Sequence, residues 1–255
     1  MSDLVAEHAR SSRKERLHRT IALIIGVWIV SDIGYYFALP AIVDRLDYNV
    51  SPVSIALYYI FWNGVAIITF WPVYVTWPIF AKWTTFDSRL VSVAIWTIAF
   101  VGAVAFALYV IPALPQFDWR EEWGAVPELP LATPLYFLPK SIEIIFQQLL
   151  IVAFVLALAA EQYKVRTISI FCAALFGSAH ILLAFSNVSW GYVARFSVLA
   201  TAFGLLFPYL ILRVQNGLAY SYIMHWAYYA FTIFMSRVVG PTTMMDFWQN
   251  LWGGS

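Results

Sequence analysis

The chain has 255 residues and a formal net charge of +1; 62% of its residues are hydrophobic and 11% are charged. Soluble domains average about 45–50% apolar and about 25% charged residues, so this composition excludes a water-soluble globular protein. The near-zero charge gives no case for nucleic-acid binding, and the single cysteine, Cys172, excludes an intrachain disulfide.

Apolar runs of about 20 residues follow one another along the chain, each long enough to cross roughly 30 Å of hydrocarbon. They predict an all-α integral membrane protein, a bundle of about seven transmembrane helices. The runs lack period-two alternation, which argues against a transmembrane barrel. Pro72 and Pro78 predict a kink in the second run. The predicted spans are Thr20–Val43, Ser54–Ala81, Leu90–Leu114, Leu138–Ala160, Thr167–Phe185, Gly191–Leu212 and Gly217–Val238.

The distribution of Lys and Arg predicts the orientation of the bundle. With a cytoplasmic N-terminus, ten basic residues lie on the cytoplasmic side and five on the other side. We therefore expect a protein integral to the plasma (inner) membrane with its N-terminus in the cytoplasm. The cytoplasmic set is Arg10, Arg13, Lys14, Arg16, Arg19, Lys82, Arg89, Lys164, Arg166 and Arg213; the outer set is Arg45, Arg120, Lys140, Arg195 and Arg237.

A single domain accounts for the chain, because no linker or low-complexity stretch interrupts it. We predict a basic cytoplasmic segment over residues 1–19, one polytopic transmembrane domain over 20–239 and an extracytoplasmic tail over 240–255. No cleavage site of the Ala-x-Ala kind is evident, so the first helix is expected to remain as an anchor. The basic segment is expected to be a solvated tail, with contact to anionic lipid headgroups as the alternative.

The longest segment between spans, Pro115–Phe137, is predicted to lie on the outer side. Its tryptophans, Trp119 and Trp123, are typical of segments that lie along the headgroup region. Binding of a protein partner is the alternative, and other membrane proteins are expected partners besides the lipid bilayer. The acidic patch in this loop is formed by Asp118, Glu121 and Glu122.

Ionisable residues inside a bilayer are costly and are therefore functional candidates. At 1.5 Å per residue, Glu143, His180 and His225 fall within roughly 15 Å of one another in depth, so that they could face one cavity. There they could activate water, bind a metal or hydrogen-bond across the bundle. The full set inside the predicted spans is Asp32, Glu143, His180 and His225.

Asp32 and two arginines lie nearer the predicted outer face. Asp32 keeps a channel or transporter function open, and it could instead pair with Arg45 or Asn63 near the outer face. Arg195 and Arg237 lie near outer helix ends, where we expect their side chains to reach the interface.

The sequence around Glu143, His180 and His225 resembles the CPBP family, intramembrane proteases that include the type II CAAX prenyl endopeptidases and are also called the Abi family. The family pattern is Glu-Glu-x-x-x-Arg, then Phe-x-x-x-His, then His-x-x-x-Asn or Asp, on three helices in this order. The resemblance covers about residues 135–235 and implies a cavity within the membrane in which a Glu-activated water attacks a peptide carbonyl. The matching segments are Ser141–Gln147, Phe176–His180 and Asn216–Ala219 leading to His225.

This chain departs from the family pattern at three positions. Under the resemblance, Glu143 corresponds to the second family Glu, and Ile142 replaces the first, which is the expected general base. Gln147 replaces the Arg, and Tyr229 replaces the Asn or Asp. General base catalysis contributes about 10²–10⁴-fold, so we expect a catalytically impaired homologue whose cavity holds a partner helix, a peptide or a lipid. The pattern residues that match are Glu143, Phe176, His180 and His225.

Two other functions stay open at this point. An active intramembrane endopeptidase would use Glu143 as base, with His180 and His225 as oxyanion or metal partners. A non-enzymatic subunit of a larger membrane complex could use the two histidines to ligate a metal ion, a haem or a pigment. We also expect Glu143 to be an unpaired buried carboxylate, so that Glu143→Gln would stabilise the bundle.

Overall fold

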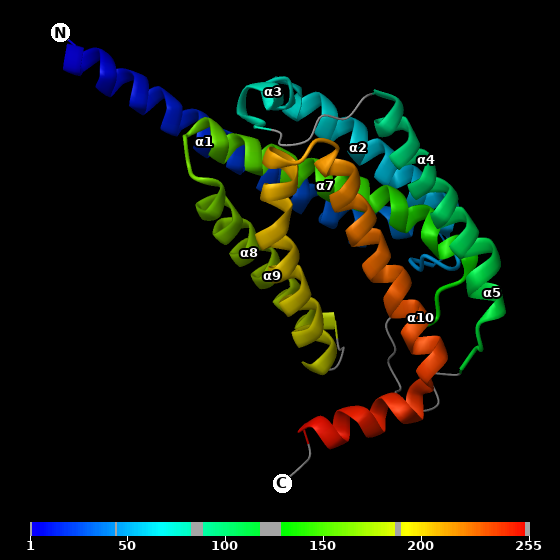
Figure 1. Cartoon of the computed structure of the whole chain (residues 1–255). Helices are drawn as coiled ribbons and strands as arrows, with labels where there is room; N and C mark the ends of the chain where they lie inside the picture. The colour runs from blue at the N-terminus through cyan, green and yellow to red at the C-terminus, as the bar shows by residue number, and fades with distance from the viewer. Residues whose placement is uncertain (1, 44, 83–88, 118–128, 187–189, 253–255) are drawn as a thin grey trace.

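The computed structural model describes residues 2–43, 45–82, 89–117, 129–186 and 190–252, and this part of the chain is helical without a β-sheet (Figure 1). The helices are α1 (Ser2–Ile33), α2 (Pro52–Tyr74), α3 (Trp77–Phe80), α4 (Arg89–Ala105), α5 (Ile111–Ala113), α7 (Phe137–Ala160), α8 (Val165–Ile181), α9 (Trp190–Arg213) and α10 (Gly217–Trp252). A turn of π-helix, Gly34–Ala38, extends α1, and another, Phe106–Val110, joins α4 to α5.

Six helices in the described ranges, not seven, are long and apolar enough to cross a membrane. The prediction of an all-helical protein with several candidate membrane spans is therefore confirmed, whereas seven as their number is not. The seventh predicted span, Gly217–Val238, is helical as the first part of α10. Polar side chains such as Ser221, His225 and Tyr228 make this stretch less apolar than the other six. The six are Glu15–Ala41, Pro52–Tyr74, Arg89–Ala113, Pro134–Ala160, Val165–Ala184 and Trp190–Arg213.

The predicted kink in the second span is a break between two helices. Pro72 lies inside α2, which ends two residues later, and Pro78 lies in the first turn of α3. Proline is well suited to a first turn, where its missing N–H would have no helical partner. The indole of Trp77 donates to the carbonyl of Ile211 at 2.9 Å and holds α3 against the end of α9.

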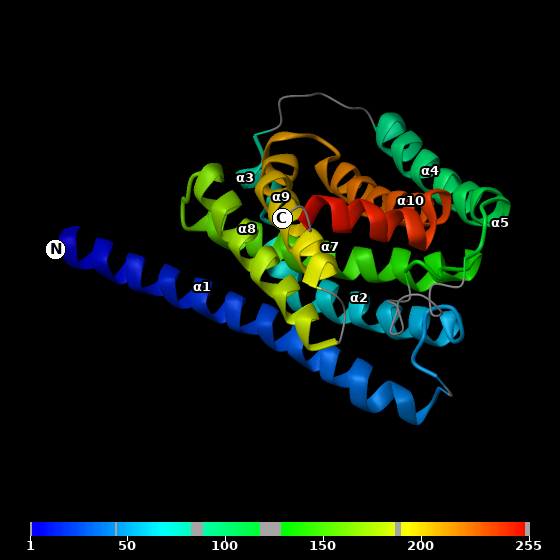
Figure 2. The ribbon, with the colours of Figure 1, turned by 90° about the horizontal axis from the view of Figure 1, so that it is seen from below.

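Helix α7 forms the centre of the bundle, and its buried residues include Ile144, Val152 and Leu156. In contrast, the span that includes α4 buries little more than Ala107 and Ile111. Large apolar side chains such as those of α4 therefore point outward, as expected when the surrounding solvent is lipid. Figures 1 and 2 show α7 between the other helices and α4 at the edge.

Small residues pack α8 and α9 tightly together. A Cβ on Gly204 would lie 2.5 Å from the Cα of Ala173, and a Cβ on Gly177 would collide with the hydroxyl of Thr201. Close backbone approach through glycine and alanine is the usual way in which helices associate in membranes. This pairing fixes the rotation of α8 and hence the direction of His180.

Two basic residues of the outer set are buried, contrary to expectation. Arg237 is 4% exposed and donates to the carbonyls of Ile111 at 3.3 Å and Ala132 at 2.5 Å. It therefore joins α10 to α5 and to the segment before α7. Lys140 is also buried. Arg195 lies over the ring of Tyr192, with 5.5 Å between the guanidinium carbon and the ring centroid.

The described part of the predicted outer loop, Pro115–Phe137, packs partly against the bundle, because Leu129, Ala132 and Tyr136 are buried. Its residues Trp119, Trp123, Asp118, Glu121 and Glu122 lie outside the described ranges.

The chain termini are helical beyond the predicted spans. Helix α1 begins at Ser2, and its basic N-terminal part projects away from the bundle (Figures 1 and 2). The predicted tail over 240–255 continues α10 as far as Trp252, and this last part turns away from the direction of the preceding helix (Figure 1). The sequence has Gly240-Pro241 in this region, and proline is a common cause of helix kinks.

Candidate functional site: an intramembrane cavity

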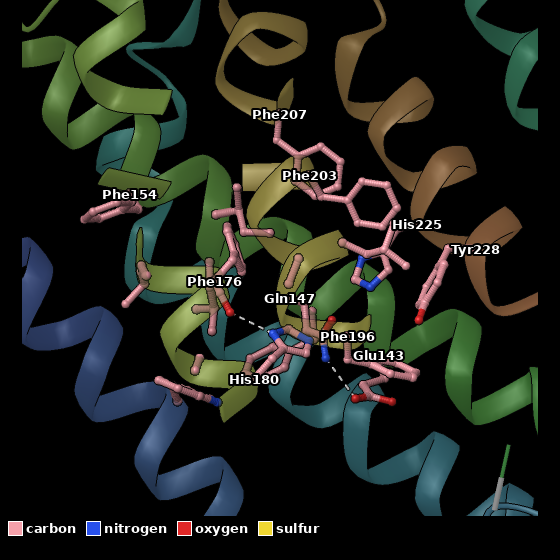
Figure 3. Close-up of a pocket in the computed structure, with 18 of the residues that line it drawn as sticks. Glu143, Gln147, Phe154, Phe176, His180, Phe196, Phe203, Phe207, His225 and Tyr228 are labelled. Carbon is pink, nitrogen blue, oxygen red and sulfur yellow. Dashed lines mark hydrogen bonds between the residues drawn. The ribbon is translucent and has the colours of Figure 1, made fainter. Parts of the chain in front are cut away.

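A cavity of about 180 Å³ lies among α1, α2, α7, α8, α9 and α10 (Figure 3). One water molecule needs roughly 10–15 Å³ of such space, so the cavity can hold a ligand much larger than water. Most of its walls are aromatic or aliphatic. Its polar lining residues are Asp32, Tyr59, Glu143, Gln147, His180, His225, Tyr228 and Tyr229.

Six of the seven pattern positions singled out in the sequence line this one cavity. Glu143 and Gln147 come from α7, Phe176 and His180 from α8, and His225 and Tyr229 from α10. The structure thus brings them together, while their roles stay predictions. Ile142 does not line the cavity and packs against the hydrophobic core.

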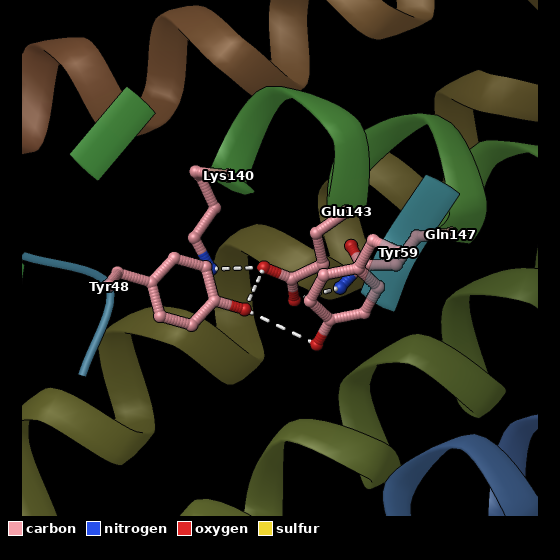
Figure 4. Close-up of polar contacts among 5 residues, drawn as sticks. All are labelled: Tyr48, Tyr59, Lys140, Glu143 and Gln147. Carbon is pink, nitrogen blue, oxygen red and sulfur yellow. Dashed lines mark hydrogen bonds and ion pairs between the residues drawn. The ribbon is translucent and has the colours of Figure 1, made fainter. Parts of the chain in front are cut away.

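Donors on three sides hold the carboxylate of Glu143 (Figure 4). Its Oε2 accepts from Lys140 Nζ at 2.6 Å and from the Tyr48 hydroxyl at 2.7 Å. Its Oε1 accepts from Gln147 Nε2 at 2.9 Å. The hydroxyls of Tyr48 and Tyr59 lie 3.2 Å apart. We call Tyr48, Tyr59, Lys140, Glu143 and Gln147 the Glu143 cluster.

The expectation of an unpaired Glu143 is therefore wrong, because Lys140 forms a buried ion pair with it. The ammonium also lies over the rings of Tyr48 and Tyr229, at 4.5 and 4.9 Å from their centroids. Aromatic faces attract cations and offset part of the cost of burying Lys140. Sequence reasoning assigned Lys140 to the outer surface, although its spacing from Glu143 (i, i+3) was a usable signal.

Tyr48 was not identified from the sequence, because it precedes α2 in a short connection 95 positions from Glu143. Burial, and then the charge of Glu143, raise the pKa of the Tyr48 hydroxyl well above its usual value. The hydroxyl thus stays protonated and serves as a permanent donor to the carboxylate. Only the tertiary fold brings this residue to α7.

His180 is held by its own helix. Its Nδ1 lies 2.8 Å from the carbonyl oxygen of Phe176. Because a carbonyl only accepts hydrogen bonds, Nδ1 carries the hydrogen, and Nε2 of the neutral ring is an acceptor. The ring is stacked at 6.4 Å from that of Phe196 on α9. Figure 3 shows the imidazole directed toward Gln147 in the middle of the cavity.

His225 enters the cavity from α10 among aromatic rings. It stacks on Tyr229 at 5.4 Å and lies 6.0 Å from the ring of Phe203, measured between centroids. Its Nδ1 is 3.5 Å from Nε2 of Gln148, which is a long contact. The Oε1 of Gln148 accepts a hydrogen bond from Ser221 at 2.9 Å. His225 is therefore held mainly by packing.

Asp32 lies at the mouth of the cavity. It lines the cavity and is exposed, as is Leu175 on α8, so the cavity opens between α1 and α8. Neither predicted partner of Asp32 pairs with it. Arg45 pairs with Asp47 at 4.0 Å, and Asn63 Nδ2 donates to backbone carbonyls of α2 and α7.

The described residues contain no group of three or more His, Cys, Asp or Glu arranged to hold a metal ion. The two histidines line the cavity together with Asp32 and Glu143, but in the described ranges these side chains do not converge on one point.

Comparison with protein-family models, with characterised proteins and with solved structures gives no match to this chain.

Proposed function

We propose that this chain is a divergent, catalytically silent CPBP-like membrane protein whose intramembrane cavity binds a ligand and does not hydrolyse peptide bonds. The observation that carries this proposal is the bonding of Glu143. Its two carboxylate oxygens already accept from Lys140, Tyr48 and Gln147. Three of the about four lone-pair positions of the carboxylate are thus occupied, and a water molecule could bond only at the remaining position on Oε1, beside Gln147, unless a donor moved away.

The position of Ile142 supports the same proposal. Under the family resemblance this position would carry the general base, but here it holds a hydrocarbon side chain packed into the core. Tyr229, at the expected oxyanion position, instead lies beside the ammonium of Lys140. The residues that replace the family pattern thus take part in packing and in the Glu143 cluster, while the cavity remains.

The proposal includes a topology with a cytoplasmic N-terminus and with α10 as a seventh crossing. Segments assigned to one side do lie together: the backbone N–H of Lys82 donates to the carbonyl of Leu212, and that of Thr133 to the side chain of Asn49. A cysteine at Gln162 in a Cys172→Ala background should resist an impermeant reagent in intact cells and react in lysed cells. Labelling of that cysteine in intact cells would show that the protein has the opposite orientation.

Proteolysis by the purified protein tests the absence of catalysis. Wild type, Glu143→Gln and His180→Ala are reconstituted in liposomes and incubated with a panel of transmembrane peptides, and an intramembrane protease of known activity serves as positive control. We expect no cleavage by any of the three. Cleavage by wild type that both substitutions abolish would overturn the proposal.

An active endopeptidase is the alternative, and one observation favours it: Glu143, His180 and His225 do line the same cavity. In that case a water molecule would bond to the carboxylate of Glu143. Tyr48→Phe, which frees a lone pair on Oε2, would then raise the rate of cleavage, whereas a silent protein stays inactive with this substitution.

A further inference from the structure

The cavity is elongated, with a polar end and an apolar end. Its lining residues on α7 run from Glu143 to Phe154, a rise of about 16 Å at 1.5 Å per residue. On α1 they run from Asp32 back to Ile24, about 12 Å. Asp32 and Glu143 lie at one end, and Ile24 and Phe154 lie toward the other. A ligand that fits this distribution has a polar group at one end of a hydrocarbon chain.

This distribution of polar and apolar lining residues argues against a peptide as the ligand. An α-helix is about 10–12 Å across with its side chains, which is too wide for a cavity of about 180 Å³. An extended peptide carries an N–H and a C=O on nearly every residue, and each needs a partner inside a membrane. Around Ile151 and Phe154 the lining is aliphatic and aromatic, so the backbone groups of a peptide would lack side-chain partners at that end. A single-chain amphiphile needs partners at one end only.

The polar end offers hydrogen-bond acceptors. His180 Nε2 is an acceptor because Nδ1 donates to Phe176. Gln147 donates an Nε2 hydrogen to Glu143, and its own Oε1 can accept a hydrogen bond from a ligand. Both side chains line the cavity and point toward each other in Figure 3. Asp32 at the mouth disfavours an anionic headgroup, which would itself supply only acceptors.

We propose that the cavity binds a neutral single-chain amphiphile with one hydroxyl group, of the long-chain alcohol type, taken from the bilayer between α1 and α8. The hydroxyl donates to His180 Nε2 or Gln147 Oε1, and the chain extends toward Phe154. This inference rests on the proposed function, because it names the ligand of the same cavity.

The test is equilibrium binding of radiolabelled dodecanol to the full chain in lipid nanodiscs. Dodecyl methyl ether, dodecylamine and dodecanoate compete as isosteres that differ in the headgroup alone. Because one hydrogen bond distinguishes alcohol from ether, the alcohol should bind about 3–10-fold more tightly. The carboxylate should bind less tightly than the alcohol, because it supplies only acceptors and meets Asp32 at the mouth.

Two sets of variants locate the binding. In a variant that combines His180→Ala with Gln147→Leu, alcohol and ether should bind equally, because the acceptors are gone. Leu175→Trp fills the mouth and should abolish binding of every dodecyl compound. The matched control is Ile170→Trp on the same helix, which is 55% exposed, does not line the cavity and should bind like wild type.

Each other outcome overturns a specific part of the proposal. Equal binding of alcohol and ether by wild type, or tighter binding of the amine or carboxylate, overturns the hydroxyl headgroup but leaves a ligand-binding cavity. Binding that survives Leu175→Trp, or no binding of any probe, overturns the amphiphile itself. The proposed absence of catalysis has a separate test, since only cleavage in the proteolysis experiment would contradict it.

Discussion

Two polar regions of the same cavity differ in how far their hydrogen-bonding capacity is used. In the Glu143 cluster, the carboxylate accepts from Lys140, Tyr48 and Gln147, and the ammonium is further surrounded by aromatic rings. We define Phe176, His180 and His225 as the histidine wall. There, His180 donates one hydrogen bond to a backbone carbonyl, and His225 makes one long contact with Gln148.

This difference separates a structural role from a binding role. A buried charge pair whose hydrogen bonds are satisfied fixes the elements that carry it, and removal of one partner is costly. An acceptor that lines a cavity and keeps unused capacity has a small role in folding and is suited to a ligand. We therefore expect substitutions of Tyr48, Lys140 and Glu143 to change stability and substitutions in the histidine wall to change binding. Gln147, which donates to Glu143 and also lines the cavity, contributes to both.

The largest expected effect is that of Lys140→Met. It leaves the Glu143 carboxylate buried without its cation, and loss of one partner of a buried pair costs about 3–5 kcal/mol. The measurement is the free energy of unfolding in detergent micelles. The double variant Lys140→Met/Glu143→Gln should recover much of this loss through coupling; strictly additive losses would contradict a paired role.

Glu143→Gln by itself should destabilise the protein by about 1–3 kcal/mol, because Lys140 loses its counter-charge. The sequence alone led us to expect the opposite sign. Thermal unfolding in the same micelles decides between the two. A higher midpoint for Glu143→Gln would show that the ion pair contributes nothing.

Tyr48→Phe removes one donor to Glu143 and keeps the ring beside Lys140. A single hydrogen bond to a charged group contributes about 1.5–3 kcal/mol, and the remaining donors limit the loss to the lower part of this range. Arg45→Ala, which breaks an exposed ion pair in the same connection, is the control and should cost less than about 1 kcal/mol.

The smallest expected effect on stability is that of His225→Leu in the histidine wall. Its one polar contact is long, so loss of the imidazole should change the free energy of unfolding by less than about 1 kcal/mol. A loss comparable to that of Lys140→Met would show that the histidine wall is structural and would remove the contrast between the two regions.

The sequence by itself determined the membrane class, the helical architecture and most helix boundaries. Hydrophobic length and composition are local properties, and lipid permits few ways to satisfy a polar backbone other than a helix. The predicted span Leu138–Ala160 therefore closely matches α7, Phe137–Ala160. The ordered motif residues also indicated that Glu143, His180 and His225 would share a cavity, as the structure shows.

Only the tertiary structure decided what these residues contact. The Lys140–Glu143 pair, the donation from Tyr48 and the burial of Arg237 depend on the rotation of each helix and on connections distant in sequence. Periodicity does not fix rotation in a membrane, because lipid-facing and core-facing positions are both apolar. Close backbone packing, as at Gly204 against Ala173, sets that rotation and thereby the contents of the cavity.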